Sequence, residues 1–152
     1  MDADGNSEAR IGWGTEFDLA GANGTLVELD EVTEVNLPEE TADDVETTHY
    51  KSPKKKKEYR GGLIDGGEGS IVLNYIPGSD TDKLITEAHR AGTPREFQCR
   101  LPDETGKPTW AINGFLIVKI RGRAIPIGDR MTMTVAVRYT GDSDEAAVAA
   151  GA

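Results

Sequence analysis

Two long runs of alternating residues in the C-terminal third of the chain constrain its fold most. In the first run, residues 109–120, the apolar residues at even-numbered positions are Trp110, Ile112, Leu116, Val118 and Ile120. In the second run, residues 131–140, the odd-numbered positions hold Met131, Met133, Val135, Val137 and Tyr139. A period of two places successive side chains on opposite faces of a β-strand. The sequence therefore predicts two strands, separated by a loop over residues 121–129.

The first run is apolar on its other face as well, because Phe115 and Ile117 occupy odd-numbered positions. A strand that is apolar on both faces needs a second layer to cover it. Contiguous exposed apolar surface of this kind marks interaction sites in soluble proteins. We therefore expect Phe115 and Ile117 to lie at a subunit interface or between the sheet and a helix.

The range from about Asp80 to Ala91 carries the pattern of an α-helix. Ser79 or Asp80 can accept hydrogen bonds from the first free N–H groups of the helix. A narrow apolar stripe follows, formed by Leu84, Ile85 and Ala88. Gly92 favours the left-handed conformation that ends a helix, and Pro94 prevents its return. We expect this one helix to pack its stripe against a sheet.

Shorter alternating segments predict further strands at residues 14–19, 25–37, 69–76 and 95–101, with a bend or bulge near Asp30–Glu31. The chain has 152 residues, including 18 glycines and 7 prolines, and only 37% are apolar. This composition favours short elements around a thin core. The predicted fold is mainly β, an antiparallel β-sandwich or barrel with one flanking α-helix.

The sequence predicts one domain over residues 12–141, because it contains neither an internal repeat nor a long linker. A flexible N-terminus is expected at residues 1–11 and a disordered, alanine-rich tail at residues 142–152. No apolar run approaches the ~18–20 residues that cross a bilayer, so no membrane span is expected.

Charge is distributed unevenly along the chain. The formal net charge is −10, and the first 46 residues hold 14 acidic residues and one basic residue. An acidic cluster comprises Glu39, Glu40, Asp43, Asp44 and Glu46. A long charged loop is expected from about Tyr50 to Gly62, with four adjacent cations, Lys54, Lys55, Lys56 and Lys57. Runs of like charge resist burial and lie in solvated loops.

Three interpretations of the lysine run stay open: a solvated loop tip, a contact with an acidic surface of another subunit, and nucleic-acid binding or a nuclear address. The net charge of −10 disfavours the last, because free-standing nucleic-acid readers are usually basic. The solvated tip and the subunit contact both stay open. On the second interpretation, the candidate subunit contacts are Lys54, Lys55, Lys56 and Lys57 with Glu39, Glu40, Asp43 or Asp44 across a subunit boundary.

No catalytic, cofactor or metal motif is recognisable in the sequence. Cys99, the single cysteine, shares an alternating face with Phe97 and is expected to be a small buried hydrophobe. The two histidines, His49 and His89, have no spacing that supports a catalytic thiol or a zinc site. The glycines of residues 61–69 lack the spacing and the following helix of a phosphate loop. We expect no cofactor and no enzyme activity.

A series of features occurs in a characteristic order: Gly12-Trp13-Gly14-Thr15, the Val- and Glu-rich strand Leu26 to Leu37, the loop Tyr50 to Gly62, the Gly/Asp turn and strand Gly62 to Tyr75, the helix exit Ala88 to Thr93, the strand end Leu101-Pro102-Asp103, Trp110, and Thr140-Gly141. This order and spacing resemble the N-terminal, tube-forming domain of the major tail tube proteins of long-tailed, non-contractile bacteriophages of the lambda type. The resemblance covers roughly Gly12 to Gly141.

The resemblance implies a structural role in the virion. Six copies would close into a ring, and stacked rings would form the tail tube through which the genome leaves the capsid. It implies a tape measure protein in the lumen during assembly, terminator and tail-tip proteins at the two ends, and DNA that passes without sequence-specific binding. The implied location is the tail of the virion, and the host cytoplasm during assembly. In this family the long loop reaches toward neighbouring subunits or the next ring.

Two other function classes stay open. A monomeric β-sandwich module that binds carbohydrate or peptide predicts a concave aromatic patch, and an enzyme predicts a polar pocket. The residues themselves agree with a tube in two respects. Fixed acids repel phosphates and suit a lumen through which DNA slides. A head-to-tail interface that closes by rotation suits a chain rich in surfaces and poor in sites.

Overall fold

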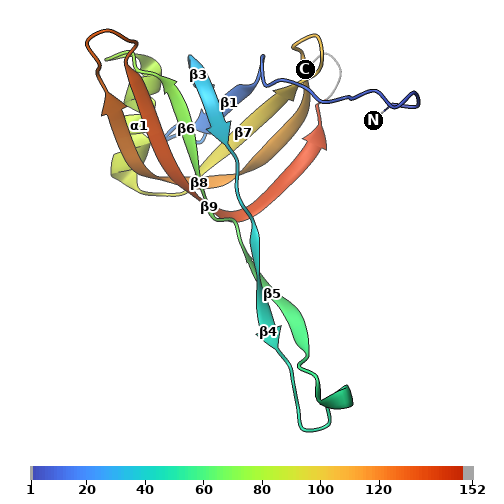
Figure 1. The fold of residues 1–152 in the computed structure, drawn as a ribbon. Helices are drawn as coiled ribbons and strands as arrows, with labels where there is room; N and C mark the ends of the chain where they lie inside the picture. Colours follow the sequence, from blue (N-terminus) through green and yellow to red (C-terminus); the bar gives the residue numbers. More distant parts are fainter. Residues whose placement is uncertain (1, 149–152) are drawn as a thin grey trace.

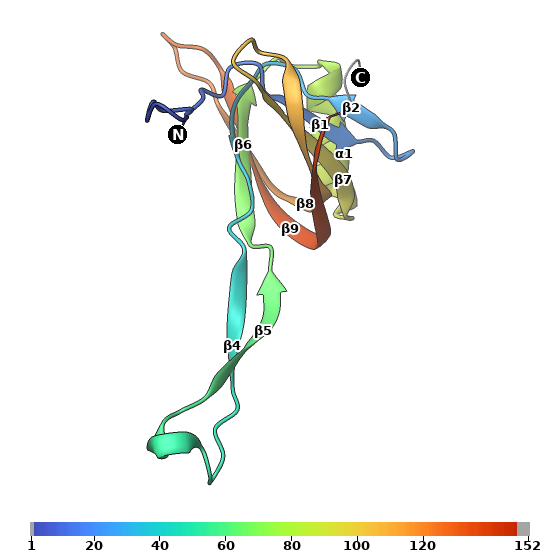
Figure 2. The ribbon, with the colours of Figure 1, turned by 90° about the vertical axis from the view of Figure 1, so that its right-hand side faces the viewer.

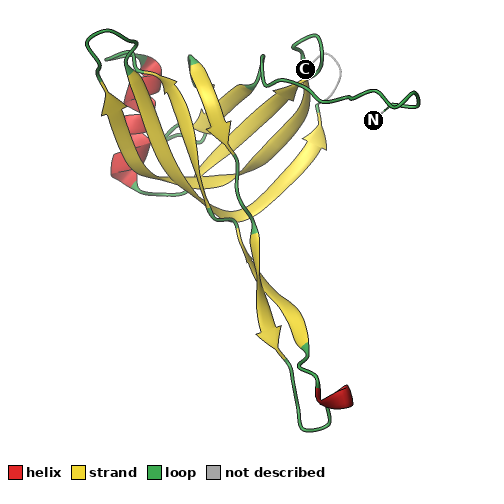
Figure 3. Cartoon of the chain, viewed as in Figure 1, coloured by secondary structure: helices red, strands yellow, loops and turns green. Residues whose placement is uncertain are grey.

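The computed structural model describes residues 2–148. Within this range the chain forms a curved seven-stranded sheet, an α-helix packed against it, and a two-stranded hairpin that projects from it (Figures 1 and 3). The strands of the large sheet are β1 Glu16–Ala20, β2 Leu26–Glu28, β3 Val32–Asn36, β6 Glu68–Asn74, β7 Arg95–Pro102, β8 Pro108–Ala124 and β9 Thr132–Ala147. The other elements are β4 Thr41–Glu46, the 3₁₀ turn η1 Pro53–Lys55, β5 Tyr59–Asp65 and the helix α1 Asp80–Ala91.

The large sheet has the strand order β2-β1-β7-β8-β9-β6-β3, and every neighbouring pair is antiparallel. The sheet curls around its core but does not close into a barrel, because β2 and β3 remain as its two edges (Figure 1). The predicted mainly β, antiparallel fold with one flanking helix is therefore confirmed. The predicted break near Asp30–Glu31 is also found, since Glu31 adopts a left-handed φ of 54° between β2 and β3.

Aromatic side chains hold the centre of the core. Phe17 stacks on Phe97 with 5.6 Å between ring centroids, and Tyr139 packs edge-on against Phe97 at 5.3 Å. The Tyr139 hydroxyl donates a hydrogen bond to the carbonyl of Asn36 at 2.9 Å and so ties β9 to the edge strand β3. Cys99 is buried in the same cluster, as predicted, and burial raises the pKa of its thiol to about 11.

The helix α1 has the predicted ends and the predicted stripe. Ser79 Oγ accepts a hydrogen bond from the N–H of Asp82, and Gly92 ends the helix with a left-handed φ of 64°. Ile85 and Ala88 are fully buried in the core, and Leu84 is partly buried against it. The helix is thus held to the sheet by apolar packing on one face.

The strands β8 and β9 run further than the alternation predicted. Residues 142–147 continue β9, and Ala147 pairs with Trp110 at the start of β8. The expected domain end at residue 141 and the expected tail from residue 142 therefore need correction. This extension could not be read from the residues 142–147, which are polar or alanine, because backbone pairing with β8 holds them in place. The last part of the predicted tail, residues 149–152, lies outside the described residues.

The N-terminal segment, residues 2–11, is exposed and forms no helix or strand in the described structure. The segment contains a local turn, in which Asp2 Oδ1 accepts hydrogen bonds from the N–H groups of Asp4 and Asn6. The flexibility expected for this segment stays a prediction.

Candidate assembly surfaces

The hairpin of residues 41–65, which we call the arm, extends away from the body of the fold (Figures 1 and 2). Thr41 pairs with Asp65 at its base, and Glu46 pairs with Tyr59 toward its tip. At ~3.3 Å per residue, β4 alone spans about 20 Å. The charged loop predicted over residues 50–62 is shorter than expected, because its last residues belong to β5.

The two glycines that suggested the end of a loop lie inside β5 instead. Partway along the arm, β5 has one residue more than β4, which is a β-bulge. A Cβ on Gly62 would lie 2.9 Å from Val45 Cγ2 and 3.1 Å from the carbonyl oxygen of Asp43. Glycine permits the close approach of the two strands at this point.

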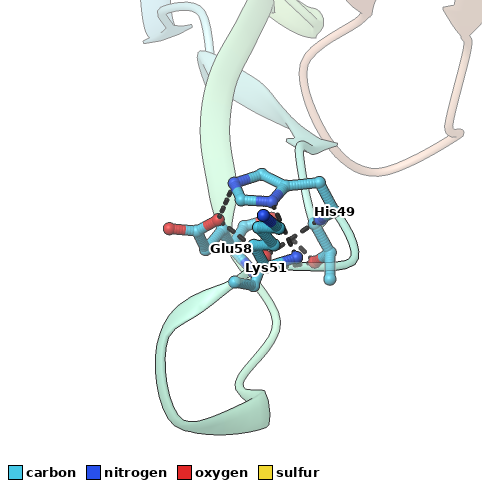
Figure 4. A network of polar contacts seen from close by, with 5 residues as sticks. His49, Lys51 and Glu58 are labelled. Atoms are coloured by element: carbon cyan, nitrogen blue, oxygen red, sulfur yellow. Dashed lines mark hydrogen bonds and ion pairs between the residues drawn. The ribbon is translucent and has the colours of Figure 1, made fainter.

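A polar network fixes the tip of the arm (Figure 4). His49 Nε2 lies 3.5 Å from Glu58 Oε2, and the N–H of Lys51 donates to His49 Nδ1 at 3.1 Å. The Ser52 hydroxyl donates to Glu58 Oε2 at 2.8 Å and accepts from the N–H of His49 at 2.9 Å. The 3₁₀ turn η1 contains no buried residue, so these contacts replace a core in shaping the tip.

The arm exposes apolar side chains along its strands. Leu63 and Ile64 are 84% and 68% exposed, and Val45 and Tyr59 are also exposed. An isolated two-stranded hairpin is marginally stable in water unless another layer covers it. The arm therefore carries a surface that its own body leaves uncovered.

The base of the arm is tightly fitted to the body. The N–H of Gly67 donates to Asp65 Oδ1 at 2.9 Å, and its carbonyl accepts from the N–H of Tyr139 at 3.0 Å. Gly67 has a left-handed φ of 70°, and a Cβ there would lie 2.6 Å from the carbonyl oxygen of Glu39. Arg138 NH2 adds an ion pair of 2.8 Å to Asp65. These contacts fix the direction in which the arm leaves the sheet.

The outer face of β8 forms a second uncovered surface. Phe115 is 43% exposed and Ile117 is half-buried, on the face opposite the buried Leu116 and Val118. A bulge after Val118 reverses the alternation, so that Ile120 joins the outer face with 63% of its surface exposed. The even-numbered pattern placed Ile120 on the same face as Leu116 and Val118, and this was wrong because alternation in the sequence does not reveal a bulge.

A charged group lies where β1 and β7 pair. Arg100 NH2 bridges Glu16 at 2.7 Å and Asp18 at 3.0 Å. Burial raises the pKa of Asp18, which Arg100 opposes, and burial with the neighbouring carboxylates raises that of Glu28. Within residues 2–148, no group of three or more His, Cys, Asp or Glu side chains is placed to hold a metal ion.

A sheet with free edges and an uncovered arm favour assembly, and comparison with known proteins decides the family. The model of the lambda phage tail tube proteins matches residues 11–146 of the chain. The chain belongs to this family. It is a structural component of a phage tail, and the function expected from the order of its sequence elements is thereby confirmed.

Solved structures share the fold of this tail tube protein at low sequence identity. A protein of the anti-feeding prophage baseplate has a TM-score of 0.70 and 9% identity, with 93% of this chain and 97% of the other covered. A tail protein of a gene transfer agent particle has a TM-score of 0.69 and 17% identity, with 90% and 98% covered. The SPP1 tail tube protein has a TM-score of 0.63 and 14% identity, with 88% and 77% covered. A search of curated proteins found no match.

The structure places the predicted subunit contacts of this tail tube protein at three sites. The lysines Lys54, Lys55, Lys56 and Lys57 are exposed at the tip of the arm and make no ion pair within the described residues. Asp43 and Asp44 lie on β4, and Glu39 and Glu40 precede it at the base. Phe115 lies on β8 and lines a pocket of about 270 Å³ with Glu40 and Ile64.

The structure thus brings Phe115 and Glu40 together and leaves the lysines at the far end of the arm. Sequence reasoning missed the exposed apolar residues of the arm, Leu63 and Ile64, because they adjoin glycines and read as part of a loop. A β-hairpin signal was present in the short β-prone stretch before Tyr50, but the charged residues on both strands masked it.

Proposed function

We propose that six copies of this tail tube protein close into a ring and that the rings stack into the tube that delivers the phage genome. Membership of the family supports this proposal, and the related tail of the gene transfer agent is described with C6 symmetry. The anti-feeding prophage baseplate is likewise described as 6-fold symmetrised. Rotational closure of a head-to-tail contact generates such a ring from one kind of interface.

The arm is the observation that carries the proposal furthest. It is a two-stranded sheet with exposed Leu63 and Ile64 and with no layer of its own chain over it. A surface of this kind gains stability only when another chain covers it. The unpaired outer edges of β2 and β3 are a further liability that neighbouring subunits would remove.

Other components follow from the same proposal. A tape measure protein occupies the lumen during assembly in the host cytoplasm, and terminator and tail-tip proteins bind the tube ends. DNA then passes without sequence-specific binding, because a net charge of −10 repels phosphates. The protein acts as a building block and not as an enzyme. No helix within residues 2–148 is both long and apolar enough to cross a membrane.

Electron microscopy of the purified full-length protein tests the proposal directly. We expect rings or tubes whose end-on class averages have six-fold symmetry. Because a tube can require an initiator, the same experiment is repeated with a purified tail-tip complex. A monodisperse monomer under both conditions, or averages with another symmetry, would contradict the proposed hexamer.

The outer face of β8 is proposed to lie at a subunit boundary. Ile117 is half-buried on that face, beside the exposed Phe115. We expect Ile117→Asp to abolish assembly while the far-ultraviolet circular dichroism of the monomer stays unchanged. Ile127→Asp, at an exposed isoleucine in the loop between β8 and β9, serves as the matched control and should still assemble. Normal tubes of Ile117→Asp would place the interface elsewhere.

The lysines at the tip of the arm, Lys54 to Lys57, are proposed to contact acids such as Glu39, Glu40, Asp43 or Asp44 of another subunit. Each exposed pair contributes only ~0.2–1 kcal/mol, but a ring repeats it at each position. Raising the salt concentration from 0.1 M to 1 M shortens the Debye length from ~10 Å to ~3 Å and should weaken assembly.

Replacing all four lysines by Ser should shorten the tubes and reduce the dependence of their length on salt. The matched control replaces them by Arg, which keeps the charge and should keep the tubes. Tubes of normal length with unchanged salt dependence in the Ser variant would show that the lysines serve as a solvated tip.

A further inference from the structure

A cleft of about 790 Å³ lies between α1 and the end of β8, away from the surfaces described above. Lys83 and Arg90 line it from the helix, and Arg121 and Arg123 line it from the strand. The bulge after Val118 creates this wall, because it turns both arginines to the face that carries the core. One bulge therefore explains both why Ile120 is exposed on the outer face and why Arg121 and Arg123 lie on the inner face.

The cleft has more cations than its own acids can neutralise. Arg121 NH2 is 2.7 Å from Asp82 Oδ1, so that this pair is internally balanced. Glu87 forms an ion pair with Arg95, whose NH2 lies 2.6 Å from Glu87 Oε1, so Glu87 is shared with a residue outside the cleft lining. Lys83, Arg90 and Arg123 form no ion pair in the described part of the chain, although Arg123 also acts on the charge of Asp82 at longer range.

The arginines of the strand are also short of acceptors. Arg123 donates to the Tyr75 hydroxyl at 3.2 Å and lies 5.6 Å from the centre of that ring. The Nε of Arg121 is buried and finds no hydrogen-bond acceptor among residues 2–148. An open basic cleft with free donors is suited to carboxylates.

The acids available for such a site lie at the other end of the sequence. The first 46 residues hold 14 of the 27 acidic residues, including Asp2 and Asp4 in the exposed N-terminal segment. The hydrogen bonds of the turn keep the pKa of Asp2 below its usual value, with the N–H of Asn6 as the largest cause, so its carboxylate is charged. The segment ends at Ile11, which is exposed, as is Trp13 just after it.

The N-terminal segment leaves the body on the side opposite α1 in both views of the fold (Figures 1 and 2). Ten residues at ~3.3 Å each can reach about 30 Å when extended. An acidic segment on one side and a basic cleft on the other side form a head-to-tail pair of surfaces, which closes into a ring by rotation.

We propose that the N-terminal segment of one subunit binds in the basic cleft of its neighbour, with Asp2 and Asp4 facing Lys83, Arg90 and Arg123. This contact rests on the ring of the proposed function and gives it a second interface, separate from the arm. Duplex DNA is the competing ligand for a basic cleft. A duplex would bring a dense row of phosphates against a net charge of −10, whereas the N-terminal segment brings only Asp2 and Asp4 to the cleft.

A peptide experiment tests the contact without requiring rings. A fluorescently labelled peptide of residues 2–11 is titrated with the full-length protein at low salt, and binding is followed by anisotropy. The control peptide carries Asn in place of Asp2 and Asp4. We expect roughly three- to thirty-fold tighter binding of the acidic peptide, and a similar loss in the protein variant Lys83→Glu/Arg90→Glu. Equal binding of the two peptides would overturn the inference.

A charge-exchange experiment provides the second test. The variant Asp2→Lys/Asp4→Lys and the variant Lys83→Glu/Arg90→Glu should each assemble poorly, whereas an equimolar mixture with complementary charges should recover assembly. If both variants are folded but their mixture does not assemble, the contact is contradicted. The contact is also contradicted if the wild type binds duplex DNA and the cleft variant has lost this binding. If the wild type forms no rings but the peptide binds as expected, the proposed hexamer fails and the contact stands.

Discussion

The body and the arm of this tail tube protein use β-strands in opposite ways. In the body, seven strands and α1 enclose a cluster in which Phe97 and Leu116 are almost completely buried. In the arm, two strands of similar length bury nothing fully, and Leu63 is 84% exposed. Side chains buried within the body therefore stabilise it, whereas the arm has no buried side chains of its own and would be stabilised by contacts with another subunit. The comparison shows that strand pairing alone does not make a core.

The largest effect that separates the two regions should come from the aromatic centre of the body. Phe97 is 1% exposed and contacts both Phe17 and Tyr139. We expect Phe97→Ala to lower the free energy of unfolding by about 3–5 kcal/mol, because it leaves a cavity that the stacked ring of Phe17 cannot fill. Urea denaturation of the monomer measures this loss. A change below about 1 kcal/mol would mean that the body also lacks a tight core.

The helix should show a graded effect within the body. Ile85 is 1% exposed, whereas the adjacent Leu84 is only partly buried. We expect Ile85→Ala to cost about 2–5 kcal/mol in unfolding free energy and Leu84→Ala clearly less. Both are measured by the same denaturation, so that each variant serves as the control for the other. An equal or larger loss in Leu84→Ala would show that the stripe packs differently.

A smaller effect should come from the ion pair that joins α1 to β8. Burial tends to raise the pKa of Asp82, but the hydrogen bonds from Arg121 and from the N–H of Gly78 outweigh burial and hold this pKa below its ordinary value. A depressed carboxyl pKa stabilises the fold above the unfolded value of about 3.9, and this contribution disappears as the pH falls through the lower folded value.

Asp82→Asn should therefore cost about 1–3 kcal/mol at pH 7. The difference from the wild type should shrink as the pH falls below about 4. Unfolding curves of both proteins between pH 7 and pH 3 measure it. A difference that stays constant over this range would assign the loss to packing and not to charge.

The smallest effect on stability, and the sharpest test of the comparison, should come from the arm. Leu63→Ser removes an exposed side chain and should change the unfolding free energy by no more than about 0.5 kcal/mol. Assembly should nevertheless fall, as measured by sedimentation of tubes. Ile127→Ser, at an exposed isoleucine in the loop before β9, is the matched control. If Leu63→Ser destabilises the monomer strongly, the arm has a core of its own.

Much of the body could be predicted from the sequence, because burial on one face imposes alternation. The strands around Ile71 and Val135 and the helix with Ser79 and Gly92 at its ends follow directly from such patterns. The end of β9 could not be predicted, since residues 142–147 are held by backbone pairing rather than by apolar side chains.

The candidate surfaces could be predicted only in part. The run of lysines could be recognised because adjacent like charges resist burial. Phe115 could be recognised because it makes its strand apolar on both faces. The bulge after Val118 was hidden, and with it the exposure of Ile120 and the inward position of Arg121 and Arg123. The register of a strand depends on both partners, and one sequence run shows only its own alternation.

The joint at Gly67 has a mechanical consequence for the tube. With no room for a side chain and with hydrogen bonds on both sides, the joint makes the arm a rigid lever and not a tether. Over an arm of about 20 Å, a rotation of five degrees at the joint displaces the tip by about 2 Å, which is enough to separate a salt bridge. If the tip contacts another subunit as proposed, the angular tolerance of that contact would be set at a single glycine in each subunit.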